Sequence, residues 1–162
     1  MSSNEIYLDD AIEVIEEVLA SGGEFKMYPK GISMLPLIKQ GVDSVVLIRD
    51  KDAQLKRHDI AFYKRDNGQF VLHRIMSCET DGTYTMCGDN QTFLETGIRS
   101  DQIIARVARL YKKEKLVRFD GLRYKIYLSI WCSMRIRLFL RLPKRVLEKI
   151  KRICTKREKT VD

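Results

Sequence analysis

The pattern that most constrains the fold of this chain is a series of short runs rich in β-branched and aromatic residues. The runs occupy residues 44–49, 59–64, 69–76, 83–87 and 102–111. Asn67-Gly68 and Asp81-Gly82 stand between successive runs, and both pairs are strong signals for a tight hairpin. Short strands with a turn signal about every ten residues predict a mainly-β core. A chain of 162 residues is long enough for one such domain with appendages.

Helical segments are expected on both sides of this β region. Residues 9–20 place apolar side chains at helical spacing and acids in the first turn, where the helix dipole favours them. Beyond residue 122 large apolar residues mix with arginines, and Pro143 kinks or restarts the helix. We therefore expect an N-terminal amphipathic helix within 1–23, a β domain at 24–118 and a basic helical tail at 119–162.

Charge is divided unevenly along the chain. Residues 1–105 carry 11 Lys and Arg against 17 Asp and Glu, whereas residues 106–162 carry 19 against 5. The first part is typical of an acidic folded domain. The second part favours anionic partners, which are lipid headgroups or nucleic acid.

The basic tail has the pattern of a helix that lies in a membrane interface. On a helical projection one side carries large apolar residues, namely Leu128, Phe139, Leu142, Val146 and Ile150. Trp131 and the opposing arginines fit an anionic bilayer surface. The alternative is a helix docked on the protein's own core, with a solvated basic face. Because no leader peptide and no run of about 20 uncharged apolar residues is present, we expect a cytoplasmic protein held peripherally at the membrane.

The cysteine pattern indicates reduced thiols. Cys78, Cys87, Cys132 and Cys154 form no C-x-x-C pair. A two-residue turn at Asp81-Gly82 would place Cys78 opposite Thr85, with Cys87 only diagonal to it, so no disulfide is implied. The chain has two histidines, which makes zinc ligation an unfavourable interpretation. We expect neither a metal nor a cofactor.

A candidate nucleophile stands in the stretch Gly31-Ile32-Ser33-Met34-Leu35-Pro36. Gly31 permits a tight bend, and Pro36 fixes its own φ and favours an extended conformation at Leu35. Such a turn displays the Ser33 hydroxyl, although the same residues also make ordinary surface turns. Backbone N–H groups near Ser33 would form the oxyanion hole.

A serine hydroxyl needs a positioned base and a group that orients that base. His73, within a predicted strand, is the preferred base, and His58 is interpreted as a solvent-exposed loop histidine. A histidine base predicts a rate that rises through roughly pH 6–7. The candidate acids are Asp89, Glu95 and Asp101. Asp89, in Gly88-Asp89-Asn90, could equally make an Asx-type turn.

Four segments in this order resemble the signal-peptidase branch of the serine peptidases, whose β core is shared with LexA-type autoproteases. They are Gly31 to Pro36, Asp59 to Tyr63, Leu72-His73-Arg74-Ile75 and Gly88-Asp89-Asn90. The resemblance implies that fold, with Ser33 as nucleophile. It implies that His73 replaces the Lys base of bacterial housekeeping members, as in the eukaryotic and archaeal type. Asp89 matches the family's first acid, and Glu95 falls where a second acid, usually Asp, is expected.

The resemblance is incomplete at three positions. Gly41-Val42-Asp43 has one residue inserted into an expected Gly-Asp pair, and His58-Asp59 replaces a second such pair. Gly31 stands where bacterial members often have a Ser that assists the oxyanion hole. The family's N-terminal membrane anchor is also not evident, which favours relatives that trim leaders from small modified peptides as much as export-type signal peptidases.

These observations predict a serine endopeptidase that removes a signal or leader peptide from a precursor bound as an added strand. The alternative is a catalytically inactive relative that acts as a membrane-surface or partner-binding module. A LexA-like DNA-binding regulator is disfavoured, because about 25 residues before the Ser33 turn are too few for a helix-turn-helix domain. No nucleic-acid partner is expected, and the oligomeric state stays open.

Overall fold

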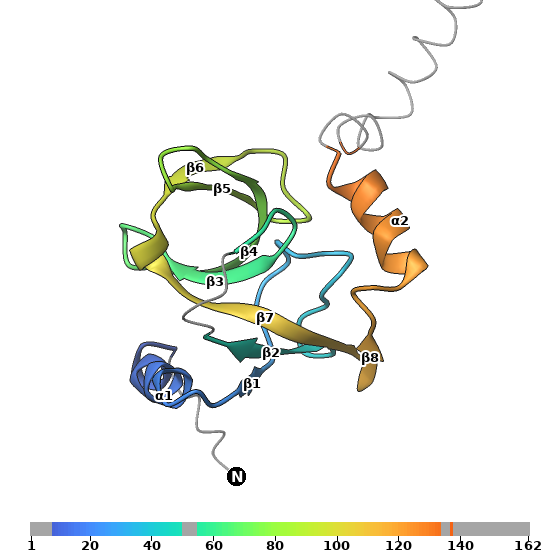
Figure 1. Ribbon diagram of the computed structural model, residues 1–162. Helices are drawn as coiled ribbons and strands as arrows, with labels where there is room; N and C mark the ends of the chain where they lie inside the picture. Colours follow the sequence, from blue (N-terminus) through green and yellow to red (C-terminus); the bar gives the residue numbers. More distant parts are fainter. Residues whose placement is uncertain (1–7, 50–54, 134–136, 138–162) are drawn as a thin grey trace, which may run out of the picture.

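The computed structural model describes residues 8–49, 55–133 and 137 and is mainly β (Figure 1). The strands are β1 (Phe25–Met27), β2 (Ser44–Ile48), β3 (Ile60–Lys64), β4 (Phe70–Cys78), β5 (Tyr84–Cys87), β6 (Glu95–Ile98), β7 (Ile103–Lys112) and β8 (Lys115–Val117). The helices are α1 (Leu8–Ala20), the short 3-10 turn η1 (Ser100–Gln102) and α2 (Leu122–Trp131). The predicted mainly-β core is confirmed.

All strand pairs are antiparallel and belong to one sheet. The order is β1-β2-β7-β3-β4-β5-β6, and β8 pairs with β7 as a branch. Register shifts interrupt four of these pairings, between β2 and β7, β3 and β7, β4 and β5, and β5 and β6. Because bulges bend strands and increase their twist, the sheet is strongly curved, and β3 to β6 close into a ring in the view of Figure 1.

Strands β6 and β8 have no clear signal in the sequence. The segment from Glu95 to Ile98 contains Glu and Gly, which are depleted in strands. It forms β6 because it pairs along the edge offered by β5, with Met86 opposite Glu95. β8 follows a two-residue turn whose residues, Lys113 and Glu114, have φ values of 48° and 63°. Such a turn normally carries Asn or Gly, so the sequence lacked the signal.

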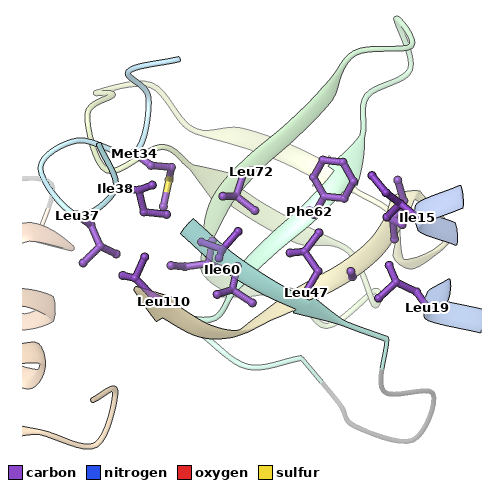
Figure 2. Close-up of a cluster of buried hydrophobic side chains, with 14 of the residues drawn as sticks. Ile15, Leu19, Met34, Leu37, Ile38, Leu47, Ile60, Phe62, Leu72 and Leu110 are labelled. Carbon is purple, nitrogen blue, oxygen red and sulfur yellow. The ribbon is translucent and has the colours of Figure 1, made fainter. Parts of the chain in front are cut away.

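The main core lies between α1, one face of the sheet and the loop that carries Ser33 (Figure 2). Ile15 and Leu19 of α1 are each 1% exposed and belong to this core, so α1 packs its apolar side against it. Full burial of such side chains stabilises a fold by about 1.5–3 kcal/mol each. Met34, Leu37 and Ile38 enter the same core from the Ser33 loop.

A second, smaller core occupies the other face of β3 and β4. It contains Ala61, Tyr63, Ile75, Met86 and Ile98. The two faces of the central strands are therefore both covered, so successive residues of β4 are buried in different surroundings.

Helix α2 packs on the domain through its aromatic side. Tyr124 stacks with Tyr127, and Tyr127 with Trp131, each at 6.1 Å between ring centroids. The Trp131 indole N–H donates to the backbone oxygen of Asp89 at 2.6 Å, and Leu128 packs against the core. Trp131 and Leu128 were expected to face a membrane, and that placement is wrong because both lie against the protein's own domain.

The rest of the expected tail helix, including Phe139, Leu142, Pro143, Val146 and Ile150, lies outside the described residues. Among the helices that the structure describes, none is long and apolar enough to cross a bilayer. Cys78, Cys87 and Cys132 are free thiols, and Cys154 is outside the described ranges. Cys78 pairs across the hairpin with Tyr84 rather than Thr85, because Glu79 bonds to Thr83 and the loop between them, residues 80–82, is one residue longer than the expected turn.

Candidate active site

A cleft of about 800 Å³ brings two of the predicted catalytic residues to one place. One wall is the loop with Ser33, and the other is the hairpin between β3 and β4 with the first residues of β4. The lining residues are Pro29, Lys30, Gly31, Ser33, Met34, Ile38, Lys64, Arg65, Asn67, Gly68, Gln69, Phe70, Val71, Leu72, His73 and Gln91. Ser33 and His73 therefore share one cleft.

The predicted tight turn at Ser33 is present, and its neighbours hold it. Gly31 has a φ of 93°, in the left-handed region that glycine tolerates best. Its N–H donates to Gln40 Oε1 at 2.7 Å. Met34 is 5% exposed and anchors the turn in the core, while Ser33 remains partly exposed at the cleft. Ser33 is thus accessible from the cleft, while Met34 holds the turn in the core.

The Gly88-Asp89-Asn90 segment clamps this turn from the other side. The Asn90 backbone N–H donates to the Ser33 backbone oxygen at 2.6 Å, and Asn90 Nδ2 donates to the Ile32 oxygen at 3.0 Å. A Cβ added at Gly88 would lie 2.7 Å from the Ser33 backbone oxygen. Glycine is needed at 88 because a backbone atom, which cannot move aside cheaply, occupies that space.

Strand alternation sends the neighbours His73 and Arg74 to opposite faces of β4. His73 faces the smaller core and the first residue of β6, where it meets Glu95. Arg74 faces the side that α2 covers, where it meets Asp89. Each of the two candidate acids therefore contacts a different basic residue.

Glu95 is the acid that contacts the imidazole. His73 Nδ1 lies 3.1 Å from Glu95 Oε1 and 3.2 Å from the Tyr63 hydroxyl. Tyr63 donates to Glu95 Oε2 at 3.0 Å. Arg65 donates to the same carboxylate through Nε at 2.8 Å and also through Nη2. Because these contacts use Nδ1, the ring nitrogen left for a proton transfer is Nε2.

Burial and neighbouring charge set the protonation of this pair. Burial of His73, 1% exposed, lowers its pKa to about 4, although the Glu95 carboxylate opposes that shift. Burial alone would raise the pKa of Glu95, but hydrogen bonds from Arg65 and Tyr63 outweigh it and hold that pKa below its usual range. At neutral pH the imidazole is therefore neutral and the carboxylate ionised.

Asp89 makes no contact with His73 and instead belongs to a buried ion pair. Arg74 Nε and Nη2 donate to its two oxygens at 2.8 and 2.6 Å, and both side chains are fully buried. Tyr127 donates to Asp89 at 2.7 Å. Arg74 Nη1 donates to the Tyr124 hydroxyl at 2.9 Å and to the His58 backbone oxygen at 2.8 Å. This network joins α2 to β4.

The remaining candidates, Asp101 and His58, do not line this cleft. Asp101 is exposed and pairs with Arg99. The interpretation of His58 as solvent-exposed is wrong, because its Nε2 is buried, and no described residue gives that nitrogen a hydrogen bond. Burial and the nearby charges of Arg57 and Arg74 lower its pKa. It lines a separate cavity of about 280 Å³ beside α2.

Sequence reasoning missed Tyr63 and Arg65. The hairpin register provides the signal that could have found Tyr63. Ala61 pairs with His73, so Tyr63 is two positions further along β3 on the same face and diagonal to the imidazole. Arg65 extends from the end of that strand, and nothing in the sequence connects it with Glu95.

Two backbone N–H groups of the Ser33 turn have no acceptor among the described residues. Within the described part of the chain, the backbone N–H groups of Ser33 and Met34 donate no hydrogen bond. There is likewise no hydrogen bond between Ser33 Oγ and the His73 ring among the contacts of the described residues. Such bonds are often formed only when substrate is bound. No cluster of three or more His, Cys, Asp or Glu side chains in residues 8–49, 55–133 and 137 could hold a metal ion.

Comparisons with protein-family models, with curated proteins and with solved structures found no match to this chain.

Proposed function

We propose that this chain is a serine endopeptidase in which Ser33 is the nucleophile, His73 the general base and Glu95 the acid that orients it. One observation carries the proposal: a buried imidazole whose Nδ1 contacts a carboxylate lines the same cleft as a serine on a tight turn. A serine nucleophile, a histidine base and an acid that orients the histidine form the arrangement that Ser-His-acid peptidases use for acyl transfer.

The reaction follows from the protonation states. Ser33 Oγ attacks the carbonyl carbon of a peptide bond while His73 Nε2 takes the hydroxyl proton. Glu95 stabilises the imidazolium, and the backbone N–H groups of Ser33 and Met34 would donate to the oxyanion. His73 then returns the proton to the leaving amine, and an acyl-enzyme forms. A water molecule, deprotonated by the same imidazole, hydrolyses that ester and releases Ser33.

The proposed substrate is a precursor protein or peptide with a signal or leader segment. The support is the order of the four segments from Gly31 to Asn90, which resembles the signal-peptidase branch of the serine peptidases. The volume of the cleft lies in the range of sites that bind several side chains or a small ligand. The Asp of the Gly-Asp-Asn segment contributes to this proposal as a scaffold residue, because its carboxylate binds Arg74.

A fluorophosphonate probe tests the proposal without knowledge of the substrate. The probe should label the protein at Ser33, and Ser33→Ala should abolish labelling, while Ser100→Ala, at an exposed serine, is the matched control. His73→Ala should reduce labelling nearly as much, because members of one catalytic unit are not additive. His58→Ala is the control for His73→Ala and should be labelled as the parent is.

Two results would contradict the proposal. An intact, folded protein that the probe never labels would favour the inactive module that binds a membrane surface or a partner. Labelling that survives in His73→Ala and disappears in His58→Ala would transfer the role of base to His58.

A further inference from the structure

Helix α2 is apolar on two sides, and only one of them is covered. Tyr124 and Trp131 pack on the domain, where they bind Arg74 and Asp89. Leu122, Ile126 and Ile130, spaced four residues apart, are 73%, 50% and 43% exposed. A helix with apolar side chains on two opposite sides normally has a contact on each of them, either in a core or in a membrane. The outer side of α2 is therefore a surface without an occupant in this chain's described residues.

The apolar surface continues from α2 onto β8. Leu116 of β8 is 54% exposed, and it lines a groove of about 770 Å³ together with Leu122. We define the α2 face as Leu116, Leu122, Ile126 and Ile130. Figure 1 shows β8 and α2 following one another at one side of the sheet. Contiguous exposed apolar surface of this kind is a sign of a protein or membrane contact.

Positive charge surrounds this face. Residues 112–125 contain six Lys and Arg against two acids. Both acids already have partners, since Glu114 binds Lys26 and Asp120 binds Arg118. The groove itself is rimmed by Lys112, Arg118 and Arg123. The complementary partner is therefore apolar inside and anionic at its surface.

We propose that the α2 face docks on the surface of an anionic lipid bilayer. The aliphatic side chains would enter the headgroup boundary, and the basic rim would contact the lipid phosphates. A nucleic acid would match the charge but not the exposed Leu and Ile. The proposal concerns a face of the folded domain, opposite the side of α2 that carries Trp131. It does not depend on the peptidase activity.

Co-sedimentation of the full chain with vesicles tests this docking. We expect binding to phosphatidylglycerol-phosphatidylcholine vesicles at low salt and loss of that binding in pure phosphatidylcholine or at high salt. Each basic residue near the surface contributes about fivefold to partitioning. The double variant Leu122→Glu/Ile126→Glu should reduce binding by at least about tenfold. Val14→Glu, on α1 at a residue 54% exposed, is the matched control and should bind as the parent does.

Thermal unfolding and probe labelling of Ser33 separate this proposal from the proposed function. Both should be unchanged in the double variant, because Leu122 and Ile126 are exposed. If the parent chain binds no anionic vesicles, or if the double variant binds them equally well, the proposal is overturned. A double variant that changes the oligomeric state but not vesicle binding would overturn it too, because the face would then be a contact between copies.

Discussion

Replacing Glu95 by Gln should inactivate Ser33 and leave the fold intact, whereas Asp89→Asn should destabilise the fold. The reason is the separation of the two acids by strand alternation. Glu95 contacts His73 Nδ1 at 3.1 Å, while Asp89 is paired with Arg74 in a fully buried position. The pair of isosteric variants removes one charge from each site with little change in shape.

The expected losses of labelling rate and of stability differ clearly between the two variants. In serine-histidine-acid systems the loss of the acid's charge lowers the rate by about 10³–10⁴-fold. Gln at 95 still accepts a hydrogen bond from Tyr63, so we expect a stability loss of about 1 kcal/mol. Removal of one partner from a buried ion pair costs about 3–5 kcal/mol. For a chain of this length that loss lowers Tm by roughly 6–20 °C.

The assay is the rate of fluorophosphonate labelling at pH 7, measured together with calorimetric Tm. Glu95→Gln should label about a thousandfold more slowly with Tm within a few degrees of the parent. Asp89→Asn should show the large fall in Tm. Asp101→Asn, at an exposed acid, should change neither quantity. A Glu95→Gln protein that labels at the parent rate, beside a stable but unreactive Asp89→Asn protein, would refute the assignment of the acids.

Four further outcomes are expected. Because burial lowers the pKa of His73 to about 4, labelling should reach its plateau by about pH 6 instead of rising through pH 6–7, and the rate profile checks this. The unfolded chain binds the His73 proton at a higher pH than the folded chain, so this group makes stability fall as pH drops from about 6.5 to 4, measurable by urea titration. Gly88→Ala should reduce labelling at least about tenfold, because the new Cβ would lie 2.7 Å from the Ser33 backbone oxygen and displace Ser33. Labelling at the parent rate would contradict this. Tyr127→Phe removes a donor to the Asp89 carboxylate and should cost about 1.5–3 kcal/mol in unfolding free energy with little effect on labelling once folded.

Local chemistry in the sequence was sufficient for much of the fold. The β-branched runs, the Asn67-Gly68 and Asp81-Gly82 turns and the amphipathic pattern of α1 predict elements whose hydrogen bonds and apolar faces depend on neighbouring residues. Gly31 and Pro36 likewise predict a turn at Ser33. These signals are local, so one sequence is enough to interpret them.

Other features depend on contacts between residues far apart in the chain. One such feature is the choice of which side of α2 packs against the domain. Tyr124, Tyr127 and Trp131 are amphipathic, so their pattern fits a membrane interface as well as a protein contact. The buried pair offers α2 a donor in Arg74, which binds the Tyr124 hydroxyl, and acceptors in Asp89, which bind Tyr127 and Trp131. That geometry exists only after β4 and β5 have paired.

The acid that serves His73 was also decided by the tertiary structure. Sequence spacing made Asp89 and Glu95 equal candidates. The choice depends on the register from β4 through β5 to β6, in which bulges shift the pairing between Ile75 and Ser77 and again between Tyr84 and Met86. Side chains alternate along a strand, so a slip of one residue moves an acid to the opposite face of the sheet. Because His73 and Arg74 are neighbours on a predicted strand, their side chains are expected on opposite faces from the sequence alone. Only the pairing of the strands determined that Glu95 contacts His73 and that Asp89 contacts Arg74.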